Sequence, residues 1–190
     1  MEQAIEKQEE QKPTRRKKEK KGMPMLLQLV LLVVVIVVLR NVMGTVLVKG
    51  SSMEPNFYHG DFVFINKLST SFGTLKKGDI VICRLNDEKK NIIKRVIGLP
   101  GEKVTIEDAK IYINDSETPL KEDYLKETWT EATGPFEFEV PKDSYLVLGD
   151  NRNDSYDARY WDHTYVSKDK IIGKAYFIYY PFQRLGSLYK

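Results

Sequence analysis

Cysteine and histidine are scarce in this chain of 190 residues. The single cysteine, Cys83, excludes an internal disulfide, so any folded domain must be held together by its core. It lies in the apolar run Ile80–Cys83, which is typical of a buried strand and predicts a core residue rather than a reactive thiol. The two histidines, His59 and His163, lie in polar stretches, so a histidine base cannot be assumed for any catalysis.

Excess charge is absent from most of the chain. Residues 1–22 contain eight Lys or Arg and five Glu, which accounts for the whole net charge of +3. Residues 23–190 contain 22 basic and 22 acidic residues, and this neutral body gives no support to nucleic-acid binding. The basic tail alone suits RNA or anionic lipid, and the apolar segment that follows it favours lipid.

Only one long hydrophobic run is present, from Met25 to Leu39. With its apolar flanks it predicts one membrane span over residues 23–43, for a hydrocarbon core of about 30 Å. A cleaved signal peptide and a buried core helix are the alternatives, although Val42-Met43-Gly44 is a poor small-x-small cleavage site. Because basic residues precede the span, the positive-inside rule predicts a cytoplasmic tail at 1–22 and an extracytoplasmic domain at 44–190.

The domain after the span is rich in short β-like runs separated by turn residues. These runs are Thr45–Val48, Gly60–Leu68, Lys76–Leu85, Asn91–Glu102, Lys103–Ser116, Ser144–Asn151 and Ile171–Phe182. With almost no helical periodicity, they predict a mostly β, antiparallel domain that is barrel-like or sandwich-like. We expect residues 107–109 at the bend of a hairpin. Residues 117–143 are charged and predict an irregular surface excursion, with a weak helical turn near 121–126.

Two adjacent serines follow the span in the segment GSSMEPN, residues 50–56. A serine hydroxyl is a weak nucleophile until a base removes its proton. The same segment also suits an ordinary loop, and residues 53, 57 and 58 beside it suit either lipid contact or packing. The segment alone therefore does not decide between a nucleophile and a loop.

A lysine lies in the middle of the apolar run that begins at Asn91. Side chains alternate along a strand, so Lys94 shares one face with Ile92 and Val96, while Arg95 shares the other with apolar neighbours. A strand with two apolar faces is covered on both sides, and desolvation there lowers the pKa of an amine from about 10.4. Lys94 can then accept a proton near neutral pH, unless it snorkels to water or pairs with a carboxylate.

A third polar segment, GDNRNDSYDAR, follows an apolar strand at residues 149–159. Its oxygen-bearing side chains also suit a calcium loop. However, Arg152 and Arg159 would repel a cation, and the alternating ligand pattern of an EF-hand is missing. We therefore expect no metal site here.

Four segments, GSSMEP, GDIVI, KRVIGLPGE and GDNRNDSYDAR, occur in the order and spacing of the bacterial type I signal peptidases. The basic tail and single span resemble the single-anchor form of Gram-positive bacteria. The resemblance covers about residues 12–182. It implies a membrane-anchored serine endopeptidase that needs no cofactor and no metal.

The resemblance also implies roles for individual residues. Ser52, rather than Ser51, aligns with the nucleophile, and Lys94 aligns with the general base. The backbone N–H of Ser52 is the expected oxyanion donor. Ser155 aligns with the serine that orients the lysine amine, and Asp157 aligns with a carboxylate that pairs with arginines.

The expected partners of Asp157 are Arg95 and Arg159, and Gly149 and Asp150 are expected to shape the same turn. The implied substrates are secreted preproteins, cleaved after a small-x-small pattern such as Ala-x-Ala. A strand-edge cleft near the bilayer suits such an extended peptide, which binds by strand addition.

The chain departs from the family pattern at several positions. Gly50 offers no side-chain oxyanion donor, Asn56 stands where threonine is usual, and Ala158 stands where serine is frequent. The run YWDHTYV, residues 160–166, replaces a shorter aromatic-glycine step, so we assign no catalytic role to its tryptophan or histidine.

Two other functions are compatible with parts of the sequence. A Ser-His-Asp hydrolase would have to use His59 or His163, but neither lies in a pattern that would orient it. An anchored β-domain that binds partners in the cell envelope would leave Ser52 unreactive. A self-cleaving DNA-binding repressor is excluded because residues 1–44 cannot supply a helix-turn-helix.

Overall fold

The computed structural model describes residues 23–71, 73–85, 90–125 and 127–187. The predicted cytoplasmic tail at residues 1–22 lies outside the described residues. The chain divides into two compact units, up to Ile36 and from Val37 onward, and each part is therefore described separately.

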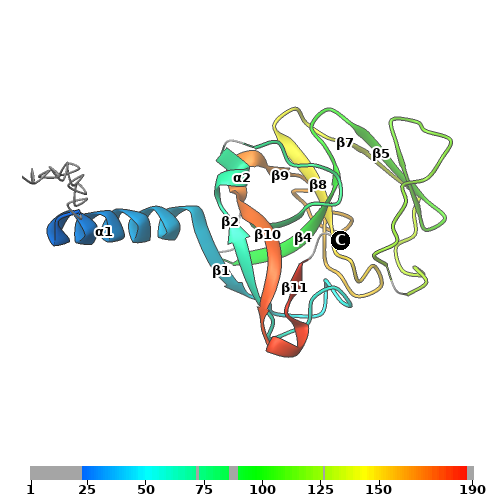
Figure 1. The fold of residues 1–190 in the computed structure, drawn as a ribbon. Helices are drawn as coiled ribbons and strands as arrows, with labels where there is room; N and C mark the ends of the chain where they lie inside the picture. Colours follow the sequence, from blue (N-terminus) through cyan, green and yellow to red (C-terminus); the bar gives the residue numbers. More distant parts are fainter. Residues whose placement is uncertain (1–22, 72, 86–89, 126, 188–190) are drawn as a thin grey trace, which may run out of the picture. The chain divides into compact units, whose positions relative to one another are not determined.

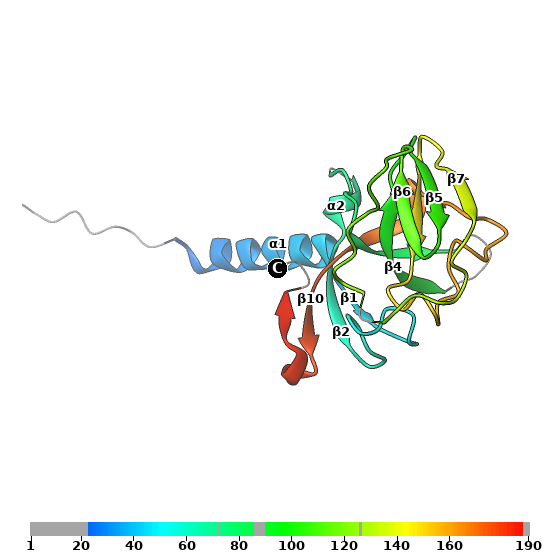
Figure 2. The same ribbon diagram turned by 90° about the vertical axis from the view of Figure 1, so that its right-hand side faces the viewer.

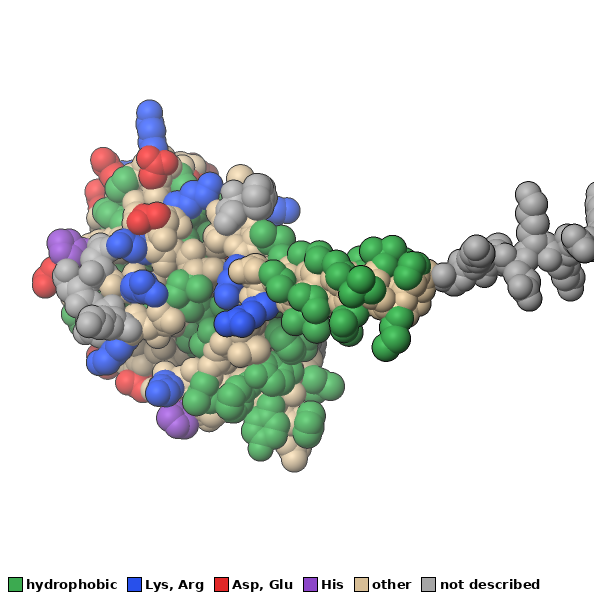
Figure 3. Space-filling model, turned by 90° about the vertical axis from the view of Figure 1, so that its left-hand side faces the viewer, with side chains coloured by type: hydrophobic (Ala, Val, Ile, Leu, Met, Phe, Trp, Pro, Cys, Tyr) green, Lys and Arg blue, Asp and Glu red, His purple; other side chains and the backbone are tan. Residues whose placement is uncertain are grey.

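Helix α1, Met25–Val42, is long and apolar enough to cross a membrane. Its 18 residues rise about 27 Å, close to the thickness of a bilayer core. None of its side chains is buried, and Figure 3 shows hydrophobic side chains over its visible surface. A core helix would be covered by protein, so this exposure disfavours the buried-helix alternative.

The remainder is mostly β and antiparallel, which confirms the predicted fold class (Figure 1). The main sheet has eight strands in the order β1-β2-β10-β3-β4-β8-β9, with β11 pairing β10. The bounds are β1 Met43–Leu47, β2 Phe62–Asn66, β3 Ile80–Arg84, β4 Asn91–Gly98, β8 Ser144–Leu148, β9 Val166–Ser167, β10 Ile171–Tyr180 and β11 Gly186–Ser187. Short helices α2 (Leu68–Ser71), η1 (Lys168–Lys170) and η2 (Phe182–Arg184) connect some of them.

Strand β3 is buried on both faces because it separates two hydrophobic cores. Ile80 and Ile82 pack into one core, and Val81 and Cys83 pack into the other. Cys83 is fully buried with a free thiol, as predicted for a core residue. β3 pairs with β4 along its whole length, so β4 is drawn into the same dry interior.

A second sheet of three strands, in the order β6-β5-β7, covers one side of the core that contains Val81 and Cys83 (Figure 2). β5 (Lys103–Glu107) and β6 (Lys110–Ile113) form the predicted hairpin, with its bend at residues 108–109. β7 (Phe136–Glu139) lies inside the region predicted to be an irregular excursion. That prediction is wrong at this end, because Phe138 is buried and pairs with Val104 of β5.

Candidate active site

The structure brings Ser52 and Lys94 together from segments 42 residues apart. Lys94 Nζ and Ser52 Oγ lie 2.7 Å apart, within hydrogen-bonding distance. Lys94 lies in β4 opposite Val81 of β3 and is only 4% exposed. The predicted sheltering of this lysine within a covered strand therefore matches its position in the fold.

Burial is the main influence on the protonation of Lys94. It lowers the pKa of the amine, while the carboxylates of Asp157 and Asp150 act in the opposite direction. The Cys83 thiol is no source of negative charge at neutral pH, because burial raises its pKa to about 12. The site therefore favours a neutral amine beside the Ser52 hydroxyl.

The two serines of the nucleophile loop, which we define as residues 50–57, point to different partners. Ser51 Oγ donates a hydrogen bond to Asp154 Oδ2 at 2.6 Å, whereas Ser52 Oγ meets Lys94. Asn151 holds the backbone of both, since its N–H donates to the Ser52 carbonyl at 3.0 Å and its Nδ2 donates to the Ser51 carbonyl at 3.3 Å. Of the two serines, only Ser52 is in contact with an amine.

The backbone N–H of Ser52 donates no hydrogen bond to any described part of the chain. The neighbouring Gly50 N–H, by contrast, donates to His59 Nδ1 at 3.3 Å. Gly50 has φ of +91°, a conformation that side-chain-bearing residues rarely adopt. The loop thus leaves the Ser52 N–H available to an incoming oxygen.

The polar segment 149–159, which we call the catalytic turn, contains a fully buried carboxylate, Asp157. Burial alone would raise its pKa, but hydrogen bonds from Arg159 and from the Gly149 N–H outweigh that effect and lower it. Arg159 Nε donates to Asp157 Oδ1 at 2.8 Å, and Arg159 Nη2 donates to Oδ2 at 2.9 Å. The expected Asp157–Arg159 pair is present.

Arg95 does not pair with Asp157, and that expectation is wrong. Arg95 Nε and Nη2 instead donate to the two carboxylate oxygens of Asp150, each at 2.7 Å. Both aspartates belong to the catalytic turn, and the register of β4 against β8 decides which one Arg95 meets. Asp150 is thus one half of a buried bidentate pair and does more than shape the turn.

Ser155 lies in the site but makes no bond to Lys94. Its Oγ is buried and makes no well-formed hydrogen bond to a described group, although its contact with Asp157 helps to lower the pKa of that carboxyl. Gly149 packs so closely that a Cβ there would fall 2.1 Å from Ser155 Oγ and 2.5 Å from the Ser52 carbonyl oxygen. Ser155 Oγ and the Ser52 carbonyl therefore both lie next to Gly149, and the orienting role of Ser155 stays a prediction.

Part of the predicted excursion covers the catalytic turn; we call residues 122–125 and 127–131 the strap. Glu122 binds Arg152 with both carboxylate oxygens, at 2.5 and 3.1 Å. The Tyr124 ring lies 3.8 Å from the guanidinium carbon of Arg95, and Trp129 lies 4.7 Å from that of Arg152. The two aromatic residues in this charged stretch were the signal that sequence reasoning missed.

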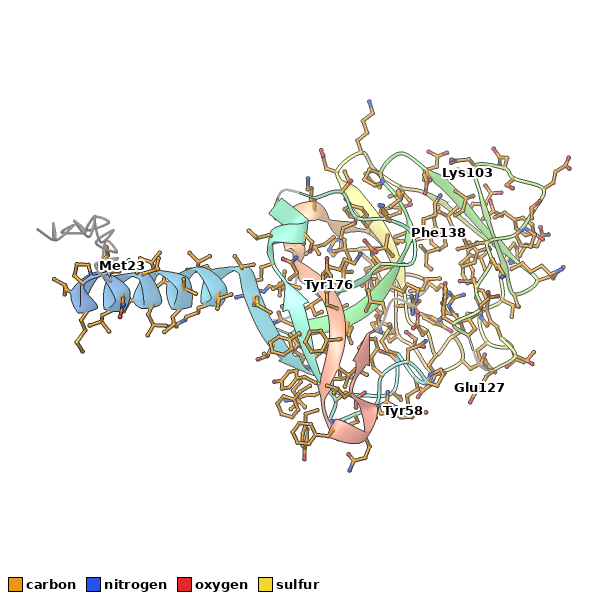
Figure 4. The ribbon with its side chains drawn as sticks, in the orientation of Figure 1. Met23, Tyr58, Lys103, Glu127, Phe138 and Tyr176 are labelled. Atoms are coloured by element: carbon orange, nitrogen blue, oxygen red, sulfur yellow. The ribbon has the colours of Figure 1, made fainter. Side chains whose placement is uncertain are left out.

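The described residues show neither a histidine-based catalytic group nor a metal-binding cluster. His59 accepts its hydrogen bond from the Gly50 backbone, and His163 is exposed. No group of three or more His, Cys, Asp or Glu among them could hold a metal ion. A cavity of about 150 Å³ lies between the nucleophile loop, the strap and the catalytic turn, lined by residues that include Tyr58 and Glu127 (Figure 4).

Comparison with known protein families shows the family to which the chain belongs. Residues 22–180 match the family model described as signal peptidase, peptidase S26. The chain belongs to the signal peptidase family S26. Signal peptidase I T of Bacillus subtilis (strain 168) is 40% identical over 147 residues, which is 73% of this chain and 75% of that protein.

Other signal peptidases show a similar likeness. A signal peptidase I of Leptolyngbya laminosa is 38% identical over 149 residues, covering 74% of this chain and 70% of that protein. A crystal structure of a signal peptidase I from Enterococcus faecalis V583 is 32% identical and covers 53% of this chain and 96% of that one, with a TM-score of 0.46. Membership of the family makes the chain a serine peptidase with signal peptidase I function.

Proposed function

We propose that this signal peptidase cleaves with Ser52 as nucleophile and Lys94 as general base. The observation that carries the proposal is the 2.7 Å separation of Lys94 Nζ and Ser52 Oγ. It is supported by the burial that lowers the pKa of Lys94, because only a neutral amine can accept the proton of the hydroxyl.

In the proposed reaction, Ser52 Oγ attacks the scissile carbonyl carbon as its proton passes to Lys94 Nζ. The carbonyl oxygen becomes negative and accepts a hydrogen bond from the Ser52 N–H, which no described group occupies. The C–N bond then breaks, and the Lys94 ammonium returns the proton to the leaving amine. An ester to Ser52 remains, and the neutral amine next activates a water that hydrolyses it.

The surrounding residues would keep this pair in place. Asp157 with Arg159, and Asp150 with Arg95, brace the catalytic turn through buried ion pairs. Ser155 is proposed to orient the Lys94 amine. Its buried hydroxyl lies beside Asp157 and makes no well-formed hydrogen bond to a described group, so a hydrogen bond from the amine would satisfy its oxygen.

We infer that the substrates are secreted preproteins cut after a small-x-small pattern such as Ala-x-Ala. β1 ends the order of the main sheet, so no strand of the described structure pairs with its outer edge. An extended peptide can add to such an edge through main-chain hydrogen bonds. Met53 and Phe57, which flank Ser52, are buried, so they serve packing rather than lipid contact.

We further propose that α1 anchors the enzyme, with residues 1–22 in the cytoplasm and residues 44–190 outside it. Contact with the bilayer is supported by an apolar surface on the β-domain, where hydrophobic side chains gather in Figure 3. Phe62, Tyr179, Tyr180 and Phe182 line a shallow cavity of the β-domain, and Phe182 is 76% exposed. Aromatic residues of this kind are enriched at membrane interfaces.

The proposal is tested with the purified full chain in detergent and a preprotein substrate. Ser52→Ala and Lys94→Met should each lower kcat by at least about a thousandfold, because nucleophile and base act as one unit. Ser51→Ala is the matched control and should cleave at nearly the parental rate, since its hydroxyl faces Asp154. Cleavage by Lys94→Met at the parental rate would remove the lysine from the mechanism.

A further inference from the structure

Asn56 connects three segments that meet behind the nucleophile. Its Nδ2 donates one hydrogen bond to Asp150 Oδ2 at 2.7 Å and another to the backbone oxygen of Tyr124 at 3.1 Å. Asn56 belongs to the nucleophile loop, Asp150 to the catalytic turn and Tyr124 to the strap. One carboxamide therefore fastens all three segments together.

The orientation of this carboxamide follows from its neighbours. A carboxylate and a backbone carbonyl are both acceptors, so the NH₂ group rather than the oxygen must face them. Asp150 already accepts two hydrogen bonds from Arg95, and the Asn56 bond joins this buried pair. A carboxylate that accepts several hydrogen bonds is held firmly in one position.

The position of Asn56 along the loop matters for Ser52. Asn151 fastens the N-terminal part of the loop by donating hydrogen bonds to the carbonyls of Ser51 and Ser52. Asn56 fastens the C-terminal part of the loop to Asp150. The end of the loop also makes a tight turn, in which the N–H of Phe57, one residue beyond Asn56, donates to the Met53 carbonyl at 2.9 Å. Ser52 Oγ is thus placed by a loop that is fastened at both ends.

We propose that Asn56 is a positioning residue, which sets the approach of Ser52 to Lys94 by tying the nucleophile loop to Asp150 and to the strap. The inference rests on the proposed roles of Ser52 and Lys94. It assigns a function to a position where the sequence departs from the usual threonine. Threonine could donate one hydrogen bond to Asp150, but it cannot bond both acceptors with two amide hydrogens.

The change Asn56→Asp tests the inference because it keeps the shape of the side chain. It removes both donor hydrogens and sets a second carboxylate against Asp150. The charged groups that act on Lys94 are Asp157 and Asp150, which favour the ammonium, and Arg159, which disfavours it; the Cys83 thiol beside it carries no charge at neutral pH because burial raises its pKa to about 12. An added negative charge beside Asp150 should favour the ammonium further.

The assay measures kcat, KM and the pH dependence of kcat/KM for preprotein cleavage by the full chain in detergent. For Asn56→Asp we expect kcat to fall about tenfold to a hundredfold, with KM changed by less than about threefold, because misplacing a reacting group costs rate more than binding. The rising limb of the profile should move to higher pH. Asn56→Thr should recover most of the rate, because its hydroxyl can still donate to Asp150.

Asn114→Asp is the matched control. Asn114 is exposed in the turn that follows β6, where its Oδ1 accepts a hydrogen bond from the Lys103 N–H, and a carboxylate can do the same. This variant should match the parent in kcat and in pH profile. It separates a general effect of added charge from an effect at Asn56.

Two results would overturn the inference. One is Asn56→Asp with the parental kcat and profile. The other is a loss of rate that follows a loss of thermal stability, with the rising limb unmoved and no recovery in Asn56→Thr. Failure of the proposed function is recognised separately, because Ser52→Ala would then still cleave.

Discussion

At the scale of single residues, the cost of burying a charged amine works in favour of the proposed reaction. Lys94 lies among β-branched side chains of β3 and β4, so its ammonium is poorly solvated and its pKa is lowered. The same burial raises the pKa of the Cys83 thiol and keeps it inert. One dry interior therefore favours the neutral form of both the Lys94 amine and the Cys83 thiol.

The absence of a side chain at Gly149 gives a prediction at this scale. In Gly149→Ala the new Cβ would fall 2.1 Å from Ser155 Oγ and 2.5 Å from the Ser52 carbonyl oxygen, so the loop must shift. Overpacking of this kind costs about 1–3 kcal/mol, and we expect both a lower melting temperature and loss of cleavage. In the control Gly186→Ala the nearest atom is 3.9 Å away, so thermal unfolding and activity should be unchanged. A fully active Gly149→Ala would contradict the packing described.

At the scale of elements, β4 and the catalytic turn are joined by a buried ion pair. The Asp150 side chain has no exposed surface, and that of Arg95 is 9% exposed. Neither group can be solvated by water if its partner is lost. The pair therefore constrains the strand that carries Lys94 against the turn that carries Asp157.

Removal of this arginine should be costly. Arg95→Ala leaves the Asp150 carboxylate buried without its guanidinium, and we expect a loss of about 3–5 kcal/mol in the free energy of unfolding, measured by urea titration. Lys121→Ala is the control, because the Lys121–Asp123 pair is 84% and 73% exposed and should leave stability unchanged. If the two substitutions lowered the free energy of unfolding equally, the buried pair would contribute no more to stability than the exposed pair.

Much of this arrangement could be predicted from the sequence, and the reasons for the exceptions are physical. Alternation of apolar residues located the strands, and the opposite faces of Lys94 and Arg95 followed from the period of a strand. The choice of Asp150 over Asp157 as the partner of Arg95 did not follow, because it depends on the pairing of β4 with β8. The strap was missed because its contacts with Arg95 and Arg152 join segments far apart in the chain.

At the scale of the whole molecule, the chain divides into two compact units, and the boundary between Ile36 and Val37 falls within α1. Only four residues lie between the end of β1 at Leu47 and Ser52, so the proposed nucleophile follows closely after the predicted span. This short connection suits a substrate whose cleavage site lies near the membrane surface.

The orientation of the chain gives the prediction at this scale. Eight basic residues in the first 22 should keep the N-terminus in the cytoplasm. Protease added to right-side-out vesicles should therefore digest the β-domain and leave the tail protected, as detected by antibodies against each end. Inverted vesicles should give the opposite pattern. A protected β-domain in right-side-out vesicles would reverse the proposed topology.

The pH dependence of kcat/KM for preprotein cleavage is the most direct test of a neutral lysine base, because it reports the ionisation of essential groups in the free enzyme. Since Lys94 must be unprotonated and burial lowers its pKa, the rate should rise with pH through an ionisation well below about 10.4. A rate that stays flat from about pH 5 to about pH 9 would contradict the role of Lys94.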